Sequence, residues 1–372
     1  MRRILQLRTP EDGTRDDSGN ASLIRRSADA PRIRFREAQI EMSHGAGGNA
    51  SRRLIEGLIA PILFPASTEP LGDAAHVDLN GRRVVITSDA FVVKPVRFPG
   101  GSIGELAVNG TVNDLAVSGA KAEALVVTLV LEAGLPTEVL RAEIEAIAQA
   151  ADEAGIRIVG GDTKVVEHGK AESMYISTTG IGAPIPGIEI NVASVRPNDK
   201  VLLSGPIGDH GVTILLARGE LDLEATELCS DTRSVLPFVQ AMANAAGSAI
   251  RWMRDPTRGG VATSLNELAR DARLGIALEE EDIPVRDAVR GACELLGLDP
   301  LHIANEGQFL AVVAPEAAET ILDAIRQVPG GDEARVIGEI KEQPAGAVLV
   351  KTRYGGTRIV DMLVGDPLPR IC

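Results

Sequence analysis

Short runs of β-branched residues alternate with longer amphipathic runs along most of the chain, and this alternation limits the fold more than any other feature. Residues 83–87, 124–131 and 156–159 have the composition of strands. Residues 137–154 instead carry apolar side chains at helical spacing. The same rhythm resumes after Pro197-Asn198-Asp199, a turn-forming stretch typical of a boundary. The pattern predicts a protein of mixed strands and helices, long enough for two domains.

The changes of pattern also predict the domain boundaries. We expect an N-terminal domain over residues 37–187, a C-terminal domain over residues 188–348, and a terminal strand with a mobile tail over residues 349–372. Residues 1–36 are polar and have no hydrophobic period, and Arg2-Arg3 is not followed by an apolar segment. They are predicted to form a disordered extension and not a signal peptide.

Charge and cysteine content exclude several classes of protein. A net charge of −14, from 38 basic and 52 acidic residues, argues against a nucleic-acid surface, and the 2% of aromatic residues leaves few platforms for base stacking. No apolar run approaches the roughly 20 residues that span a membrane. Cys229, Cys293 and Cys372 are too widely spaced for a disulfide framework or a zinc site, which favours a reducing, cytoplasmic setting.

Four acidic residues lie at predicted strand or loop ends near glycine-rich turns: Asp89, Asp114, Asp162 and Asp255. Any one of them would more often be a helix cap or a solvated charge. Together they indicate a nucleotide–metal site, because hard oxygen ligands suit Mg²⁺ bound with phosphates. The chain has no GxxxxGK[ST] motif, so a P-loop is excluded.

Two glycine-rich turns could present backbone amides to phosphates. One runs over residues 44–48 before a predicted helix, and the other runs over residues 160–164 after a predicted strand. An ordinary helix entry explains the first turn equally well. Asn113-Asp114 interrupts an apolar stretch, where burial without a partner or metal is costly. The candidate nucleotide-binding residues are therefore His44, Gly45, Gly47, Gly48, Asp89, Asn113, Asp114, Gly161, Asp162 and Thr163.

The chain ends on Cys372, after two prolines that favour an extended approach. Terminal residues are usually mobile unless they dock, so this thiol could visit more than one site. Its own α-carboxylate is expected to raise the pKa of the Cys372 thiol, and deprotonation would then need help from another group. The tail taken alone leaves open that the cysteine is incidental.

An ordered set of motifs resembles the HypE family of [NiFe]-hydrogenase maturation factors, within the PurM-like (AIR synthetase-like) superfamily. The resemblance covers roughly residues 38–372 and ends on the family's terminal signature, Pro369-Arg370-Ile371-Cys372. The other motifs are residues 44–48, 87–89, 98–104, 110–120, 161–166, 208–211, 254–261 and 304–307. Each is modestly specific alone, whereas the ordered set is highly specific.

The resemblance implies an α+β protein with the two-domain PurM-like fold, a homodimer formed through an ATP-binding N-terminal domain, and ATP with Mg²⁺ in a cleft. It implies that a HypF partner carbamoylates Cys372 and that ATP-dependent dehydration turns this thiocarboxamide into a thiocyanate. The cyano group would then pass to iron on a HypC–HypD complex. The same resemblance assigns Lys164 as a cation and Glu306 as a base around the thiocarboxamide. The four acidic residues, Asp89, Asp114, Asp162 and Asp255, are the candidates to bind the metal or position the phosphates.

Two other functions remain open. A small-molecule kinase or synthetase of the same superfamily would use the nucleotide site and leave the tail idle, so deleting Cys372 would spare its turnover. A non-catalytic scaffold in metallocentre assembly would show no ATP hydrolysis coupled to the tail. Selenophosphate synthetase is disfavoured, because its reactive cysteine or selenocysteine lies near the N-terminus and none of the three cysteines here does.

Overall fold

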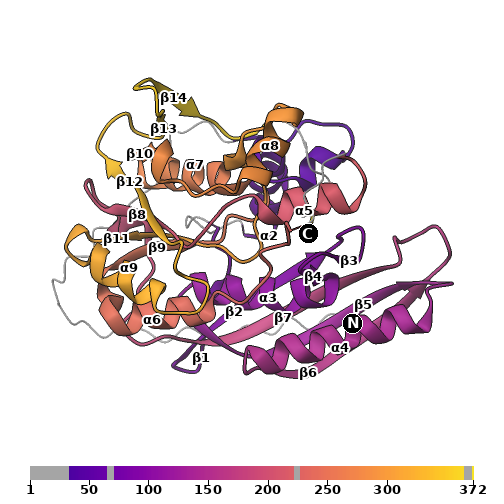
Figure 1. Cartoon of the computed structure of the whole chain (residues 1–372). Helices are drawn as coiled ribbons and strands as arrows, with labels where there is room; N and C mark the ends of the chain where they lie inside the picture. The colour runs from indigo at the N-terminus through magenta and orange to yellow at the C-terminus, as the bar shows by residue number, and fades with distance from the viewer. Residues whose placement is uncertain (1–32, 65–70, 222–226, 364–370) are drawn as a thin grey trace, which may run out of the picture.

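The computed structural model describes residues 33–64, 71–221, 227–363 and 371–372. Two β-sheets lie one above the other, with helices between them and above the upper sheet (Figure 1). One sheet is built from residues 75–184 and the other from residues 200–360. These two units confirm the predicted α+β class and the division into two domains.

The first sheet has five strands in the described part of the chain and is covered on one face only. Side by side they are β1 (Ala75–Leu79), β2 (Arg82–Phe91), β7 (Met174–Pro184), β5 (Ala120–Glu132) and β6 (Arg157–Val166). Helices α3 (Ile103–Val117) and α4 (Thr137–Glu153) pack together, and α3 contacts β2, β5 and β7. A short ribbon of β3 (Arg97–Phe98) and β4 (Gly101–Ser102) precedes α3. The predicted helix at residues 137–154 is confirmed.

Helix α3 is buried on nearly all sides, because it lies between the first sheet and helix α6 (Leu236–Ala246) of the second domain. Ser102 caps it, accepting a hydrogen bond from the Glu105 amide at 3.5 Å, as its position in the sequence predicts. Gly104 allows α4 to approach closely, since a Cβ atom there would lie 2.5 Å from the Glu143 carbonyl oxygen. The helix that carries Asn113-Asp114 is thus held firmly in place.

The second sheet has seven described strands. In spatial order they are β14 (Thr357–Val360), β13 (Val348–Lys351), β10 (Gly275–Glu279), β12 (Arg335–Lys341), β8 (Lys200–Leu203), β11 (Leu310–Val313) and β9 (Ile250–Arg254). Side chains alternate across β11: Ala311 and Val313 share a core with α6 and α9 (Ala318–Arg326), whereas Leu310 and Val312 pack with α7 (Gly260–Ala272). Helices α5 (Asp209–Ala217) and α8 (Asp287–Leu296) form a third, smaller cluster.

Three details differ from the sequence-based predictions. The glycine turn predicted at residues 160–164 is wrong, because β6 continues through it as the parallel ladder partner of the long strand β5. Asp89 lies within β2 and not at a strand end, because β2 keeps pairing with β7 as far as Phe91. Strands β13 and β14 belong to the second sheet, so the terminal unit expected at residues 349–372 is not separate there.

The chain ends differ in how much the structure describes. Residues 1–32 and 364–370 lie outside the described residues, and the predicted disordered extension and the two prolines of the tail fall there. Phe35, placed in the extension by the sequence, packs edge-on against the His44 ring at 5.2 Å and so belongs to the folded part. This N-terminal segment includes η1 (Met42–Gly45), α1 (Gly48–Leu54), η2 (Ile55–Ile59) and α2 (Ala60–Leu63).

Candidate active site

Three carboxylates from distant parts of the chain converge where the two domains meet. Asp73 precedes β1, Asp114 lies on α3, and Asp255 follows β9; one oxygen from each fits within 4.8 Å of the others. The Thr87 hydroxyl of β2 lies 2.9 Å from Asp114 Oδ2. Arg254 pairs with Asp73 at 2.9 Å. The cluster therefore combines acids from both domains around one point.

Burial makes charge on these acids unfavourable. It raises the pKa of Asp255 to about 8, with the charge of Asp73 as the next cause. Burial and then the charge of Asp255 raise the pKa of Asp114, and burial raises the pKa of Asp73 although Arg254 opposes it. A divalent cation would offset this repulsion, and carboxylate oxygens are ligands that Mg²⁺ accepts. The donor set therefore fits a magnesium ion.

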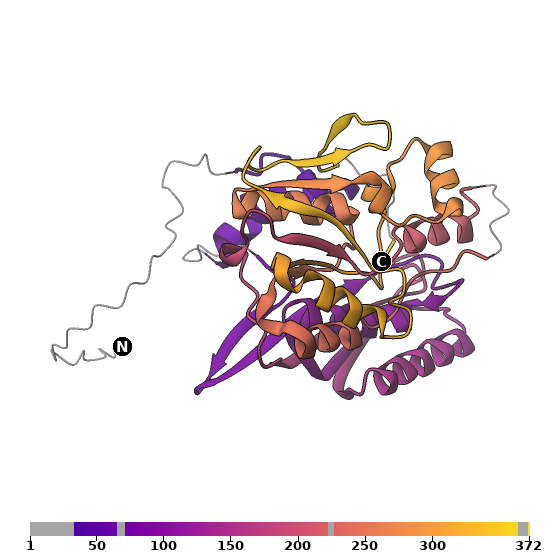
Figure 2. The same ribbon diagram turned by 60° about the vertical axis from the view of Figure 1, so that its left-hand side comes forward.

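The described end of the tail docks beside this cluster in the same chain. Ile371 is only 3% exposed and packs into the main hydrophobic core. The Cys372 thiol interacts with the carboxyl of Glu306, and the charges of Arg258 and Asp89 also act on it. In both ribbon views the C-terminus lies at the junction of the two domains (Figures 1 and 2). One chain thus brings its own terminal cysteine to its own carboxylates.

The docked thiol favours its protonated form. Burial raises the pKa of Cys372 well above its usual range, the charge of Glu306 adds to this rise, and Arg258 opposes it. The direction agrees with the sequence-based prediction, but the causes are burial and Glu306, where the prediction invoked the α-carboxylate. Conversely, negative charge on Cys372 is the main cause that raises the pKa of Arg258.

The backbone of Glu306 is held in place by the side chain of Asp231. Glu306 is 4% exposed, and burial followed by the charge of Asp255 raises its pKa well above the usual range. The carboxylate of Asp231 accepts hydrogen bonds from the amides of Glu306 and Gly307 at 3.0 and 3.1 Å. Asp231 was not singled out from the sequence, because no local pattern shows that it contacts a loop so far along the chain.

Asn113, predicted to bind nucleotide, instead links the domains. Its Nδ2 donates to the carbonyls of Arg233 and Glu306 at 3.0 and 3.2 Å. Its Oδ1 accepts from the Val235 amide at 2.8 Å. Because its polar atoms are engaged by protein, Asn113 serves here to hold the loop that carries Glu306 and not to bind a phosphate.

The predicted group on β6 lies on the other face of the first sheet. Thr178 of β7 donates to the Ala107 carbonyl of α3 at 3.0 Å, so its neighbour Ser177 faces away from α3. Ser177 pairs with Thr128, which in turn pairs with Asp162. Side chains paired across strands share a face, so Asp162 also points away from α3.

Lys164 shares that outer face and contacts Asp162 at 2.5 Å, and both side chains are exposed. Lys164 lowers the pKa of Asp162, whereas the buried acids have raised values. Gly161 and Thr163 lie between these positions on β6. A single chain therefore does not bring Asp162 or Lys164 to Asp114, which is carried by α3 on the covered face.

The first glycine turn does reach the site region. A Cβ atom on Gly47, whose φ is +78°, would lie 2.8 Å from the Arg258 carbonyl oxygen, and one on Gly48 would lie 2.7 Å from that of Leu363. Arg258 Nη1 in turn donates to the Gly45 carbonyl at 3.4 Å. The Gly47 amide is already bonded to Ser51 Oγ. The turn thus packs between the Arg258 loop and the segment that leads to the tail, and phosphate binding by it stays a prediction.

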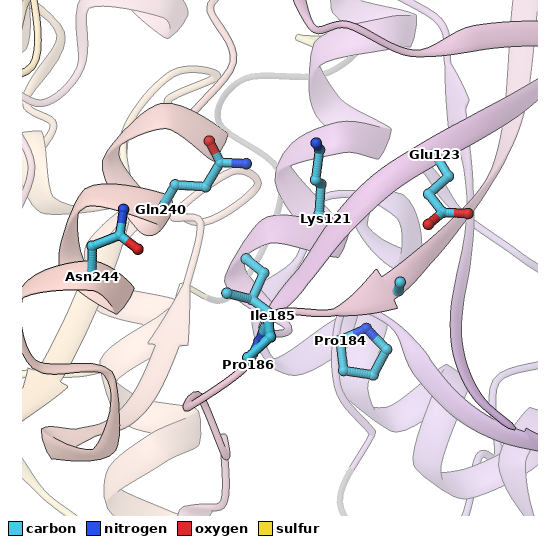
Figure 3. Close-up of a pocket in the computed structure, with 8 residues that line it drawn as sticks. Lys121, Glu123, Pro184, Ile185, Pro186, Gln240 and Asn244 are labelled. Carbon is cyan, nitrogen blue, oxygen red and sulfur yellow. The ribbon is translucent and has the colours of Figure 1, made fainter. Parts of the chain in front are cut away.

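A separate hollow lies away from these groups. A space of about 330 Å³ is lined by Lys121 and Glu123 of β5, by residues 183–186 at the end of β7, and by Gln240 and Asn244 of α6. Figure 3 draws these lining side chains. None of the predicted site residues lines it. The hollow therefore does not belong to the carboxylate site.

Comparison with known protein families identifies the class of proteins to which this arrangement of two sheets and buried acids belongs. Residues 71–183 match the N-terminal domain of AIR synthase related proteins, and residues 196–351 match their C-terminal domain. This is the PurM-like class that the sequence motifs predict. Among the residues the structure describes, no helix is both long enough and apolar enough to cross a membrane.

Within that class the similarity is specific. The chain is 48% identical to the carbamoyl dehydratase HypE of Azotobacter vinelandii over 341 residues, which are 92% of this chain and 99% of that protein. A HypE–HypF complex structure matches with a TM-score of 0.78 and 41% identity, covering 83% of this chain and 99% of that one. A structure of HypE in complex with ATP matches with a TM-score of 0.75 and 40% identity, covering 90% and 100%. The chain belongs to the HypE family of carbamoyl dehydratases.

Proposed function

We propose that this chain is an ATP-dependent enzyme that dehydrates a carbamoyl group on its own Cys372 to a thiocyanate, which supplies the cyanide ligand for the iron of [NiFe] hydrogenases. The observation that carries the proposal is the docking of Cys372 beside Glu306, next to a buried cluster of carboxylates from both domains. An idle tail, as the kinase alternative requires, would have no reason to bury Ile371 at this position.

ATP is the co-substrate, a role supported by the ATP complex of the related HypE. Asp73, Asp114 and Asp255 would hold the accompanying Mg²⁺, and the charge of Asp89 also reaches Asp255. When bound, Mg²⁺ would neutralise charge on the phosphates during transfer. Asp73 replaces Asp162 in the proposed ligand set, because Asp162 lies on the outer face of the sheet.

The chemistry needs a better leaving group than the carbamoyl oxygen. That oxygen attacks the γ-phosphorus of ATP, an O–P bond forms, and the bond to ADP breaks. The nitrogen then loses its two protons, the C–O bond breaks with release of phosphate, and the carbon–nitrogen triple bond forms on the Cys372 sulfur. The balance is thiocarboxamide plus ATP to thiocyanate, ADP, phosphate and a proton.

Glu306 is the proposed base for the nitrogen protons, because its carboxyl lies against the Cys372 side chain. Its raised pKa makes the ionised form a stronger base than an exposed glutamate would be. Arg258, which interacts with the same side chain, is the proposed cation within the chain for charge that develops on the phosphorylated oxygen. Arg258 lies in residues 254–261, one of the motifs that resemble the family, but the motif alone indicates no role for it.

A second copy of the chain would cover the face of the first sheet that carries Lys164. The outer face of the first sheet carries apolar side chains on three neighbouring strands, with Ile86, Val126 and Ile181 exposed by 39, 39 and 40%. A second copy that packs against this face would bury these apolar side chains, which supports a homodimer formed through the N-terminal domains. Lys164 and Asp162 on the same face would then lie at the contact between copies.

The partners follow from the family. The complex of a related HypE with HypF supports HypF as the carbamoyl donor. A HypC–HypD complex is the proposed acceptor of the cyano group. A free thiol as the carrier requires a reducing compartment, so we place the protein in the cytoplasm.

Binding of Mn²⁺, a paramagnetic substitute for Mg²⁺, tests the proposed site. In the presence of ATP, Asp255→Asn and Asp114→Asn should each weaken Mn²⁺ binding about tenfold or more, measured by electron paramagnetic resonance. Asp209→Asn is the matched control, since Asp209 is also buried but pairs with Arg286 at 2.8 Å. Equal Mn²⁺ affinity in the wild type and both cluster variants would contradict the proposed metal–nucleotide site.

A further inference from the structure

A buried histidine side chain holds the last peptide group of the tail. His210, fully buried in the first turn of α5, places its Nε2 2.9 Å from the carbonyl oxygen of Ile371. This contact joins residues 161 positions apart in the sequence. It fixes the peptide unit immediately before Cys372, so it controls where the Cys372 side chain can lie.

Hydrogen bonding determines which ring nitrogen carries the proton. A carbonyl oxygen can only accept, so Nε2 of His210 must donate to Ile371. In the neutral ring Nδ1 is then an acceptor, and the Ser230 hydroxyl, 2.8 Å away, donates to it. The Ser230 oxygen meanwhile accepts from the Thr232 amide at 3.1 Å and contacts the Thr232 hydroxyl at 2.7 Å. The hydrogen bonds in this chain can therefore run in only one direction: Thr232 donates to Ser230, Ser230 donates to His210, and His210 donates to Ile371.

The surroundings of the imidazole maintain this state. Phe98 meets the His210 ring edge-on, with ring centroids 5.6 Å apart and an interplanar angle of 84°. Burial lowers the pKa of His210 to about 4, so the ring is neutral at physiological pH. A neutral, immobilised ring offers one fixed donor to the tail.

We propose that His210 is a positioning residue for the carrier cysteine: it binds the Ile371 carbonyl through Nε2, and Ser230 with Thr232 holds the ring in the tautomer that this bond requires. The buried Ile371 side chain supplies the apolar half of the same docking site. The site therefore suits a chain end with an apolar penultimate residue. The inference deepens the proposed function, since Cys372 is the group that the docking presents.

The same loop also supports the proposed base. Ser230 orients His210, and its neighbour Asp231 binds the amides of Glu306 and Gly307. One short segment thus determines the positions of both the docked tail and Glu306. All of these contacts are made between groups of the protein, so the docking can be tested without nucleotide.

Alkylation of Cys372 by iodoacetamide measures the docking directly in the full-length protein without ATP or HypF. His210→Phe removes the donor and should raise the rate of Cys372 alkylation about tenfold or more, because the buried thiol is released. His210→Gln, whose amide can still donate, should restore at least part of the protection. Ser230→Ala should give an intermediate rate, since the ring loses the group that selects its tautomer. Peptide mass spectrometry follows each cysteine separately.

Internal references make the result decisive. Exposed Cys229 should react equally in every variant, and buried Cys293 should stay unreactive wherever the fold is intact. His302→Phe is the matched control, because His302 bonds another backbone carbonyl before the tail, that of Asp361, at 2.9 Å.

Unchanged Cys372 alkylation in His210→Phe would overturn the proposal. So would equal acceleration in His302→Phe, which would indicate general loosening of the C-terminal segment. Either failure would leave the Mn²⁺ test of the nucleotide site unaffected, so the two proposals can fail separately.

Discussion

The domain junction encloses its charged groups, whereas the outer face of the first sheet leaves its charged groups in solvent. At the junction, burial raises the pKa values of Asp255 and Glu306. On the outer face, Asp162 pairs with Lys164 and its pKa is lowered. Enclosed groups influence one another strongly within one chain, whereas exposed groups are screened until another surface covers them.

The two regions also differ in how many of their contacts a single chain supplies. The junction already holds the terminal cysteine, an acid and an arginine from the same chain. In the part of a single chain that the structure describes, the outer face is exposed, with Val126 of β5 and Ile181 of β7 exposed by 39 and 40%. Under the proposed function, one chain would supply the tethered substrate and its base, and Lys164 would contribute only from a second chain.

The largest effect is expected at the junction. Glu306→Gln keeps the size of the side chain but cannot accept the nitrogen proton, so turnover of the carbamoylated tail should fall about 10²- to 10⁴-fold. Glu333→Gln, an acid that pairs with Arg286 at 3.1 Å, is the control and should leave turnover nearly unchanged. Release of phosphate per carbamoylated chain gives the rate. Retention of turnover in Glu306→Gln would remove Glu306 from the mechanism.

Mixing two defective chains tests whether Lys164 acts across a contact between copies. Lys164→Ala alone should lower turnover about 10²-fold, and Cys372→Ser alone should abolish it. In a mixed pair, the Lys164→Ala chain supplies the tail and its partner supplies the lysine. Random exchange should therefore restore about a quarter of the wild-type rate, since half the pairs are mixed and each has one competent site. Complete absence of restoration would mean that Lys164 acts within its own chain or not at all.

A smaller effect is expected in the pH dependence of the free energy of unfolding, and it should come from His210 in the enclosed region. Burial lowers the pKa of His210 from 6.5 to about 4, so between these values the unfolded chain binds more protons than the folded one. Stability should then rise with pH across this range and be lost as the pH falls from 6.5. At pH 5 this loss is about 2 kcal/mol. Urea unfolding of His210→Gln should show a flatter profile by that amount; an equally steep profile would contradict the assignment.

The smallest effect is expected in the helix that separates the two regions. Ser102→Ala removes the N-cap of α3 and should lower the free energy of unfolding by about 1 kcal/mol. Ser118→Ala, at the other end of α3, should change it by less than about 0.5 kcal/mol. Alkylation of Cys372 should stay slow in both variants. Rapid alkylation in Ser102→Ala would show that tail docking depends on α3 more than on His210.

Much of the fold was predictable because its signals are local. The helix at residues 137–154 has a strong apolar period, and the structure places it at Thr137–Glu153. Ser102 was predictable as an N-cap for the same reason. The continuation of β6 through Gly160-Gly161 was not, because glycines that indicate a turn locally are outweighed by a ladder with β5.

The site was only partly predictable, because it depends on contacts between distant residues. Asp114 and Asp255 could be proposed from their motifs, and the structure brings them together. Asp73 lies outside every matching motif. The face of the sheet on which Asp162 lies depends on register, and a bulge in the pairing of β5 with β6 makes that parity unreadable from the sequence.

The mass of the C-terminal peptide after reaction tests the central claim most directly. The full-length chain is mixed with HypF and carbamoyl phosphate, and ATP is supplied or withheld after the carbamoyl transfer. The account predicts that the peptide ending in Cys372 gains one carbamoyl group and then, only with ATP, loses one water, while Cys372→Ser shows neither change. A carbamoyl adduct that persists unchanged with ATP, or no adduct on Cys372 with a competent HypF, would contradict it.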